Sequence, residues 1–573
     1  MSACPRVSGV LMTYPGRGGA TRGVERRPRV GRARPRPAGR NWVGGGRIGY
    51  WPKMGRGTRY AEREVKMSAG LEFELPDLRK LGLATVHLPL QRLRTSYFDT
   101  EDLRLWQRGT TLRHRVGEDD PGTWTLKLPE ESGDQALSRT EVSWPGDVRQ
   151  VPNEATGILQ GIVRRATLEP VVILEAIRQR LVVRSGEASL GEIDDDIVTV
   201  ASGGKTGLTF RQIEFELTSD HAVPDVNQAT VELVLKAMQQ AGAQVDPRQK
   251  FAMSLGGEDR PEASAHKIGR RSTLASVVQQ ALRGGLGRIL DFDVVLRSGP
   301  ANPSARAIHQ TRVATRRLRS DLKTFRPVLD PVWLEHTRSD LKWLGAVLGR
   351  VRDVDVLAER LATGGATSPL EDRGEHLLLS KLAGERRRHS KDLQDALQSE
   401  RYLDMLDRLH AGVWSPPYWV SPHRQQNDTG GFEPDAPARD VLPQLVDVHW
   451  RKLRRRVRRA GPRPTDAQLH GIRIASKQVR YAAEAAASAI GKPARRMAHR
   501  AEDLQTVLGQ HHDSVAAVEW LERVPAPGAE TASFAAGTKV AEERRRQAKL
   551  RRRWGRSWHR LDAGKVAHWL ERP

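Results

Sequence analysis

Cysteine is nearly absent from this sequence. One is found in 573 residues, Cys4, close to the N-terminus. Disulfide bonds and thiolate metal sites are therefore excluded from the rest of the chain, and this scarcity is typical of a reducing compartment. No apolar run approaches the roughly 18 residues of a membrane span, and no signal-peptide core is visible. We therefore expect a cytoplasmic protein with no membrane association.

Acidic and aromatic residues are also scarce relative to basic ones. The chain has 94 Lys and Arg against 69 Asp and Glu, a formal net charge of +25, and 5% Phe, Trp and Tyr. The charge predicts a polyanionic partner such as nucleic acid, polyphosphate or an anionic surface. The low aromatic content gives little support for the base stacking by which proteins hold single-stranded nucleic acid.

About half of the excess charge lies in a basic leader, residues 1–60, which holds 14 Lys and Arg and one Glu. Its Gly, Pro and Arg content and its lack of apolar periodicity predict disorder. One interpretation is a nucleic-acid-binding tail, the only part of the chain for which we expect that partner. The other is an upstream extension that is not made in the cell, with Met54 as the true start.

The rest of the chain divides by its periodicity into a strand-rich part and a helical part. Short alternating segments predict strands over 61–254, and a hydrophilic linker follows at 255–272. From 273 to 523, leucines and alanines at spacings of three and four predict helices. A loop rich in Pro, Gly and Asn at 413–440 divides this region into halves, 273–412 and 441–523, and 524–573 reads as a basic helical tail.

The two helical halves repeat one another. HQTRVATRRL from His309 is matched by HGIRIASKQV from His470, and LGAVLGRVRD from Leu344 by LQTVLGQHHD from Leu504. The two motifs recur in the same order at nearly the same distance. This indicates two large half-domains of one design, not a solenoid with short periods.

Charged residues alternate with apolar ones along several predicted strands. In EREVK (62–66), the side chains of Glu62, Glu64 and Lys66 share one face, because alternate residues of a strand point the same way. Taken singly, such a strand most simply has one solvated face. The set is unusual because arginines and carboxylates fill these positions with little Ser or Thr. The other members are Arg113 and Arg115, Lys127, Arg139 and Glu141, Arg178 and Arg180, and Glu214 and Glu216.

A sheet closed into a barrel with these faces inward would have a charged lumen. Guanidinium groups bind phosphate oxygens through two parallel hydrogen bonds. Clustered carboxylates are the oxygen ligands that Mg²⁺ and Mn²⁺ prefer. Such a lumen predicts a linear polyphosphate as its ligand.

The same residues resemble the CYTH, or triphosphate tunnel, family. EREVK matches its ExExK signature, and SYFDTEDLRLWQRGTTLRHRV, WTLKLP, SRTEV and IEFEL follow in the family's order over roughly 61–254. The resemblance implies an eight-stranded antiparallel tunnel that hydrolyses triphosphate compounds with a divalent metal. Some members of the family make cyclic AMP instead, so adenylate cyclase activity is an alternative.

The resemblance also implies roles for particular residues. Glu62, Glu64 and Lys66, with the further tunnel acid Glu141, would be catalytic. Glu175 stands about where an arginine is expected, which leaves open a tunnel that binds polyphosphate without hydrolysing it. The metal ligands would be Glu62, Glu64, Glu214 and Glu216. The phosphate path would be lined by Lys66, Arg113, Arg115, Lys127, Arg139, Arg178 and Arg180, with Lys250 as a looser match.

The helical half carries two cationic stripes. His309, Arg312, Arg316 and Arg319 fall within an arc of about 80° on a helix, and the same spacing recurs in the second half. Solvated helix faces usually intersperse acids to form pairs along the helix, and these positions contain none. The pattern therefore favours an anionic ligand. The second stripe is His470, Arg473, Lys477 and Arg480.

These motifs, with LGxxRDxDV, resemble the CHAD domain, a helical module of two similar halves. The RD pair is Arg352 and Asp353 in the first half, and HD from His512 and Asp513 in the second. We expect the two aspartates to position the helices or to pair with arginines, and not to bind the ligand. The resemblance implies polyphosphate binding, with localisation at polyphosphate granules as an extension of that idea.

The sequence therefore predicts an α+β protein. An N-terminal antiparallel eight-stranded β-tunnel would hydrolyse inorganic triphosphate or a related triphosphate with Mg²⁺ or Mn²⁺. A C-terminal all-α domain of two repeats would bind polyphosphate.

Overall fold

The fold is known from a computed structural model, which describes residues 58–61, 64–117, 122–129, 139–186, 188–217, 224–256, 268–299, 302–363, 368–418, 432–524 and 530–571. Most of the basic leader, Glu62 and the side chain of Arg139 lie outside these residues, so the predictions made for them stay predictions.

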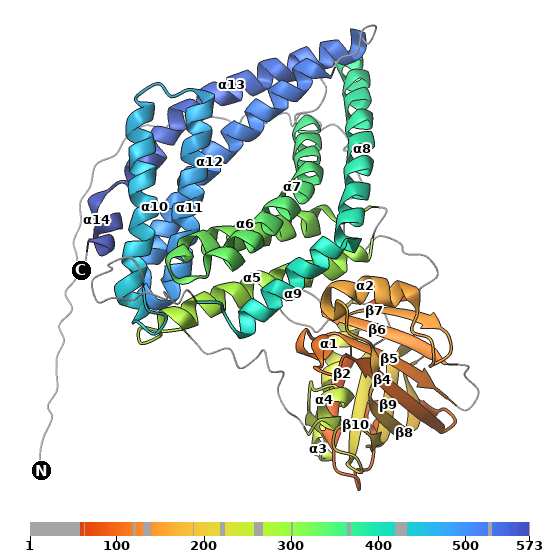
Figure 1. The fold of residues 1–573 in the computed structure, drawn as a ribbon. Helices are drawn as coiled ribbons and strands as arrows, with labels where there is room; N and C mark the ends of the chain where they lie inside the picture. The colour runs from red at the N-terminus through yellow and green to blue at the C-terminus, as the bar shows by residue number, and fades with distance from the viewer. Residues whose placement is uncertain are drawn as a thin grey trace, which may run out of the picture. The chain divides into compact units, whose positions relative to one another are not determined.

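The first part of the chain is a single antiparallel sheet (Figure 1). The strand order is β1-β7-β6-β5-β4-β8-β9-β10-β2-β11, with β3 pairing with β8 beside this path. The strands are β1 (Thr58–Ala61), β2 (Glu64–Ala69), β3 (Ala84–His87), β4 (Gln91–Asp99), β5 (Thr111–Val116), β6 (Thr123–Pro129), β7 (Arg139–Pro145), β8 (Glu169–Ser185), β9 (Ala188–Ser202), β10 (Thr209–Leu217) and β11 (Gln244–Val245).

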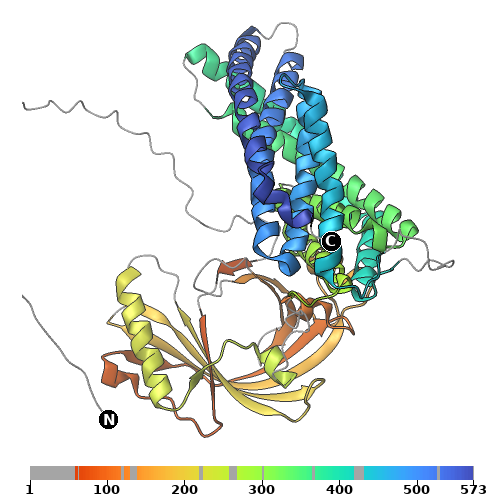
Figure 2. The ribbon, with the colours of Figure 1, turned by 90° about the vertical axis from the view of Figure 1, so that its left-hand side faces the viewer.

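The sheet closes on itself through its first strand. β1 pairs with β7, and β2, two residues further along the chain, pairs with β10. Residues 58–69 therefore bridge the two ends of the strand order, and the sheet becomes a tunnel with an inner and an outer face. Figure 2 shows the strands curving round this space.

The predicted strand count of eight needs correction. The described residues contain eleven strands, because the first strand is counted in two pieces and the short β3 and β11 are added to it. Without those additions the tunnel wall consists of eight long strands. The predicted class, an antiparallel β-tunnel followed by an all-α region, is confirmed.

Apolar side chains on the outer face of the strands are covered by helices. Met67, Ile193 and Phe215 form a buried cluster with Val234 of α3 (Pro224–Gln240). A second cluster, under α2 (Asn153–Val163), includes the fully buried Trp124. Since alternate residues of a strand point to opposite faces, this packing directs the charged residues of the same strands into the tunnel. Two short helices, α1 (Arg104–Gln107) and α4 (Lys250–Ser254), complete this part.

The second part consists of helices, most of which begin at an N-cap. Ser304, Asp330 and Ser368 accept backbone hydrogen bonds, and Thr465 forms a capping box with Gln468. The helices are α5 (Leu274–Arg297), α6 (Ala305–Thr324), α7 (Pro331–Leu361), α8 (Pro369–Gln398), α9 (Glu400–Trp414), α10 (Ala438–Ala460), α11 (Asp466–Ile490), α12 (Lys492–Arg523), α13 (Glu530–Leu561) and α14 (Gly564–Ala567).

The repeat seen in the sequence is a repeat of helices. The motifs from His309 and His470 lie on α6 and α11, and those from Leu344 and Leu504 on α7 and α12. Most of the predicted basic tail is α13. Its Ala535 packs in one apolar cluster with Leu378 of α8 and Leu521 of α12. Among the described helices, none is long and apolar enough to cross a membrane.

Candidate functional site

Glu214 lies at the centre of the charged groups inside the tunnel. Its carboxylate contacts Lys66 at 2.5 Å and Lys250 at 2.8 Å, and Arg178 lies 3.8 Å away. Lys66 also pairs with Glu64 at 2.9 Å. Burial favours the neutral form of Glu214, but Lys250, Lys66 and Arg178 outweigh it and hold its pKa well below the usual value.

Two aspartates of β9 complete this cluster. Arg178 hydrogen-bonds to both oxygens of Asp196, at 2.7 Å each, and also pairs with Asp194. Lys250 lies 3.0 Å from Asp196. Burial raises the pKa of Asp194, and the charges of Asp196 and Glu214 raise it further against the opposing effect of Arg178. The pKa of Asp196 is lowered because Lys250 and Arg178 outweigh its burial.

Among the described residues of the tunnel, two arginines have no acidic partner. Arg113 lines the same small cavity as Lys66 and Glu214, and its buried Nε has no hydrogen-bond partner. Arg115 donates to Thr95 at 3.3 Å. Within the described part of the tunnel, neither guanidinium has a carboxylate within ion-pair distance. Burial, with repulsion from Arg113 and Arg178, lowers the pKa of Arg115 to about 10.

The other predicted tunnel residues lie around this centre. Lys127 pairs with Glu141 on the neighbouring strand, and Arg180 pairs with Glu192. Glu216 is exposed, whereas Glu214 is largely buried. The structure brings together Glu64, Lys66, Glu214, Arg178 and Lys250, and Glu216 lies directly opposite Glu64 where β10 pairs with β2.

Glu175 lies on the outer face of the tunnel. Its carboxylate is exposed and pairs with Arg94 at 2.6 Å, on the face of β8 opposite to Arg178. It therefore does not take the place of a tunnel arginine. The one sequence feature that suggested a degenerate tunnel does not touch the lumen.

The tunnel carboxylates have the chemistry of divalent-cation ligands, although no three of them gather closely enough to form a metal site among the residues that the structure describes. Glu64, Asp194, Asp196 and Glu214 offer only oxygen ligands, as Mg²⁺ and Mn²⁺ require. The buried Oδ1 of Asp194 accepts no hydrogen bond within the described residues, and its ion-pair partner Arg180 lies 3.4 Å away. Burial, with the charges of Asp196 and Glu214, raises the pKa of this carboxyl, and a cation beside it would favour its ionised form. Each of these carboxylates instead contacts a lysine or arginine.

In the helical part, the two predicted stripes meet at one site. α6 and α11 lie side by side, with Arg316 donating to the hydroxyl of Tyr481 at 3.0 Å and Lys323 to Gln478 at 3.0 Å. Burial lowers the pKa of Lys477 to about 6, assisted by the charges of Arg316, Arg473 and Arg312. Cations from both halves are thus close enough to repel one another.

The two aspartates of the second motif pair with these arginines, as expected. Asp353 lies 3.4 Å from Arg312, and Asp513 lies 3.9 Å from Arg473. The glycines of the two LG pairs occupy equivalent places. The guanidinium of Arg312 lies against α7 where a side chain at Gly349 would be, and Nε of Arg473 lies 3.8 Å from the place that a Cβ atom at Gly509 would occupy. The site thus has approximate two-fold symmetry between the repeats.

The outer members of the stripes differ from the central ones. His309 is exposed, and Arg319 is half-buried on α6. Arg480 pairs with Glu484 at 2.7 Å and with Glu502 at 2.9 Å, so much of its charge is already balanced. The candidate anion site is therefore centred on Arg312, Arg316, Arg473 and Lys477, which lie close enough to repel one another.

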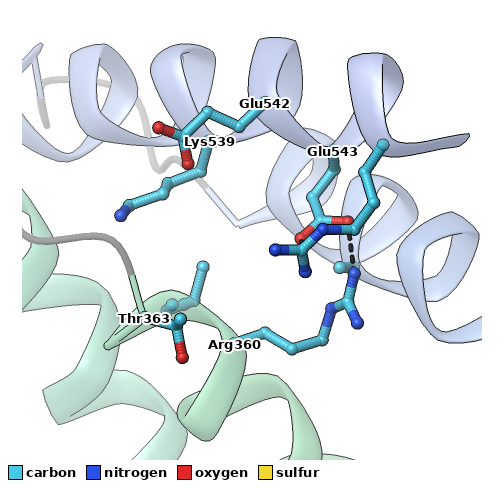
Figure 3. Close-up of a pocket in the computed structure, with 8 residues that line it drawn as sticks. Arg360, Thr363, Lys539, Glu542 and Glu543 are labelled. Atoms are coloured by element: carbon cyan, nitrogen blue, oxygen red, sulfur yellow. Dashed lines mark hydrogen bonds and ion pairs between the residues drawn. The ribbon is translucent and has the colours of Figure 1, made fainter. Parts of the chain in front are cut away.

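A separate cavity of about 230 Å³ lies between α13 and the ends of α7 and α12 (Figure 3). Arg360 pairs there with Glu543, and the buried Lys539 lies 3.4 Å from Glu375. Arg546 lies 3.5 Å from Glu543. Because its cations are matched by carboxylates, this cavity has little net charge to offer a ligand. We assign these pairs to the attachment of α13.

Sequence reasoning overlooked two tunnel residues. Asp194 and Asp196 alternate in GEIDDDIV on β9, the same pattern that identified the other strands. Lys250 matched only loosely because it reaches the tunnel from α4, so no strand periodicity points to it. The signal in the sequence was the run Asp194–Asp196, whose first and third residues share one face of a strand.

Fold and site together define a two-domain protein, in which a charged β-tunnel precedes a helical domain with a cationic site. Comparison with family models agrees: residues 61–246 match the CYTH domain and residues 280–522 match the CHAD domain. The chain belongs to the proteins that combine these two domains in this order.

The chain is also similar to two curated proteins and to several solved structures. The chain is 28% identical over 460 residues to two uncharacterized proteins of Mycobacterium tuberculosis, from strains CDC 1551 and H37Rv, covering 76% of this chain and 82% of theirs. The CHAD domain of Ricinus communis is 26% identical, with a TM-score of 0.41, over 52% of this chain and 95% of that one. A putative adenylyl cyclase from Hippeastrum, described as having a dominant triphosphatase activity, is 19% identical, with a TM-score of 0.22, over 35% and 98%.

Proposed function

We propose that the CYTH domain hydrolyses inorganic triphosphate, or a related triphosphate, with Mg²⁺ or Mn²⁺, and that the CHAD domain binds polyphosphate. Hydrolysis of triphosphates is the common activity of the CYTH family, and polyphosphate binding is the property associated with CHAD. The chain's own residues give independent support to both parts.

The observation that carries the tunnel proposal is the separation of charge within it. Asp194, Asp196 and Glu214 cluster on β9 and β10, while Arg113 and Arg115 on β5 have no carboxylate within ion-pair distance in the described residues. A triphosphate with a bound cation has the complementary arrangement: the cation faces carboxylates and the bare oxygens face guanidinium groups.

Glu64, Asp194, Asp196 and Glu214 would hold the metal. A divalent cation bound there supplies positive charge that withdraws electrons from a phosphoryl group and lowers the pKa of a bound water. Arg113 and Arg115 bind non-bridging oxygens and orient the chain of phosphates along the tunnel. Glu141, buried beside Lys127, remains the predicted further tunnel acid.

Without ligands, Lys66, Lys250 and Arg178 neutralise the same carboxylates. Once those carboxylates have another cationic partner, the three side chains become available for phosphate oxygens. Metal and triphosphate should therefore strengthen each other's binding. The space among these residues is small, about 20 Å³, and is lined by Lys66, Lys250 and Glu214 together with Arg113.

The test is phosphate release from inorganic triphosphate, ATP and long-chain polyphosphate, with Mg²⁺, Mn²⁺ or EDTA. We expect release from triphosphate with metal only, and a loss of at least about 100-fold in Glu214→Gln, since one charge central to three cations is removed. Glu175→Gln, which removes an acid of the outer face of the tunnel, is the matched control and should retain wild-type rates.

Three results would contradict the proposal. Equal activity of Glu214→Gln and Glu175→Gln would show that the hydrolytic site is not inside the tunnel. Formation of cyclic AMP from ATP in place of phosphate release would assign cyclase activity. Polyphosphate binding without release from any substrate would make the protein a binding module only.

A further inference from the structure

The two halves of the CHAD site differ at two equivalent positions. Where the first half has Arg316 and Arg352, the second has Lys477 and His512. Arginine stays charged at any physiological pH, whereas lysine and histidine lose their protons when burial or neighbouring cations make the charge unfavourable. The site therefore joins a permanently charged half to a titratable one.

The contact between His512 and His470 limits how many protons these two imidazole rings can carry. Its Nδ1 lies 3.2 Å from the Nδ1 of His470, and the ring centroids are 4.4 Å apart. Two facing nitrogens at this distance share one hydrogen, so one ring must act as acceptor and be neutral. Without an anion, the His470–His512 pair holds at most one positive charge.

The surroundings of this pair are cationic on several sides. Arg473 and Lys477 of α11 act on the pair, and Arg312 and Arg316 of α6 act in turn on Lys477. Asp513 on α12 and Asp353 on α7 are the nearby acids, each paired with an arginine. The neighbouring His511 is buried and turned toward Asp466 at 3.2 Å, and Arg551 also acts on it.

This environment opposes protonation of the second half. Burial, with Arg473, His470 and Lys477, lowers the pKa of His512 to about 4, and burial with Arg473 and Lys477 lowers that of His470. The pKa of Lys477 is lowered to about 6. Near neutral pH these groups are therefore largely neutral in the ligand-free protein.

We propose that the second half of the CHAD site takes up protons when it binds polyphosphate, through Lys477 and the His470–His512 pair, whereas the first half binds with fixed charge. The inference rests on the proposed polyphosphate binding and adds its regulation. An oxyanion placed among these residues relieves the repulsion between cations, which raises their affinity for protons. Binding should consequently tighten as the pH falls.

Calorimetry in buffers of different ionisation enthalpy measures this uptake directly. The full chain would be titrated with long-chain polyphosphate in EDTA between pH 6.5 and 8. Long chains keep the terminal phosphates, which titrate near neutral pH, a minor part of the ligand. We expect uptake of roughly one to two protons per site and a loss of about tenfold in affinity per pH unit for each proton taken up.

Matched variants assign the protons. Lys477→Arg with His512→Arg gives the second half the charges of the first, and should bind at pH 8 more tightly than wild type, with little uptake. Arg352→His places a titratable ring at the equivalent position of the first half and should increase uptake. Circular dichroism checks that each variant folds.

The outcomes separate this inference from the function on which it rests. Absence of polyphosphate binding at every pH overturns both. Tight binding by wild type with the same apparent enthalpy in all buffers overturns proton uptake alone. Uptake that persists unchanged in the double arginine variant overturns its assignment to Lys477 and His512.

Discussion

Glu214 and Asp321 are both buried carboxylates, yet their surroundings act on them in opposite directions. Glu214 contacts two lysines and lies near an arginine, so its charge is stabilised. Asp321 of α6 has a buried Oδ1 without a hydrogen-bond partner, and its nearest cation, Arg317, is 3.9 Å away. Burial raises the pKa of Asp321 to about 7, with Glu484 adding to the effect. Charged carboxylates inside this protein are thus tolerated where cations surround them.

A pH-dependent stability follows from Asp321. In the folded protein it keeps its proton up to about pH 7, whereas in the unfolded chain it loses it near the ordinary pKa of 3.8. The folded state binds more protons between these values, so stability should fall as the pH rises from about 4 to 7. Asp321→Asn removes this loss, and its stability relative to wild type should rise across that window by roughly 1–3 kcal/mol.

Thermal unfolding at pH 5 and pH 8 measures the effect. The control is Asp395→Asn, which changes an exposed aspartate of α8. A difference between Asp321→Asn and wild type that is the same at both pH values would show that Asp321 is ionised in the folded protein.

Among the helices, α13 depends on close approach to α8. A side chain at Gly374 would collide with the backbone oxygen of Thr531 and with Ala535, so α8 and α13 pack here through a glycine. Gly384, ten residues further along the same helix, has only the end of Arg387 within 3.8 Å. Close packing thus requires glycine at position 374, whereas position 384 has room for a side chain.

The contrast predicts opposite effects of the same substitution. Gly374→Ala should destabilise the protein by roughly 1–3 kcal/mol because α13 must move away. Gly384→Ala should stabilise it by about 0.5–1 kcal/mol, because alanine has less conformational freedom than glycine in the unfolded chain and therefore loses less on folding. Chemical denaturation of both variants is the measurement, and destabilisation by Gly384→Ala equal to that by Gly374→Ala would refute the packing argument.

At the level of elements, local sequence patterns predicted which strand residues line the tunnel, but not the contacts that segments distant in the sequence make with it. The alternation of Glu64 with Val65 and of Lys66 with Met67 identified the inner face, because a strand has a period of two. Lys250 could not be found in this way, since a tertiary contact brings α4 to the tunnel. The strand count differed for a similar reason, because short pairings such as β11 depend on a neighbour and not on their own sequence.

At the level of the whole molecule, the repeat predicted two similar halves but not their meeting. The stripes on α6 and α11 were visible as spacings, whereas their convergence on one site depends on how the two helices pack. The contact of His470 with His512 likewise joins residues from α11 and α12 that no single periodicity connects. Charge patterns are local, while the sites they form are tertiary.

The proposal of two ligand sites in one chain predicts two separate regions of protection from hydrogen exchange. Hydrogen exchange should slow in β2, β9 and β10 when inorganic triphosphate and Mg²⁺ are added, because the ligands hold strands that line the tunnel. Long-chain polyphosphate in EDTA should instead slow exchange in α6 and α11. Protection of the same elements by both ligands would show that the protein has a single site for phosphate chains.

The central claim, that the tunnel cleaves triphosphate, is tested most directly by ³¹P NMR of the wild-type protein with inorganic triphosphate and Mg²⁺. We predict that the triphosphate signals are replaced by pyrophosphate and orthophosphate in equal amounts, and that EDTA prevents this. Triphosphate signals that shift or broaden on binding, but yield no products with Mg²⁺ or Mn²⁺, would contradict the account.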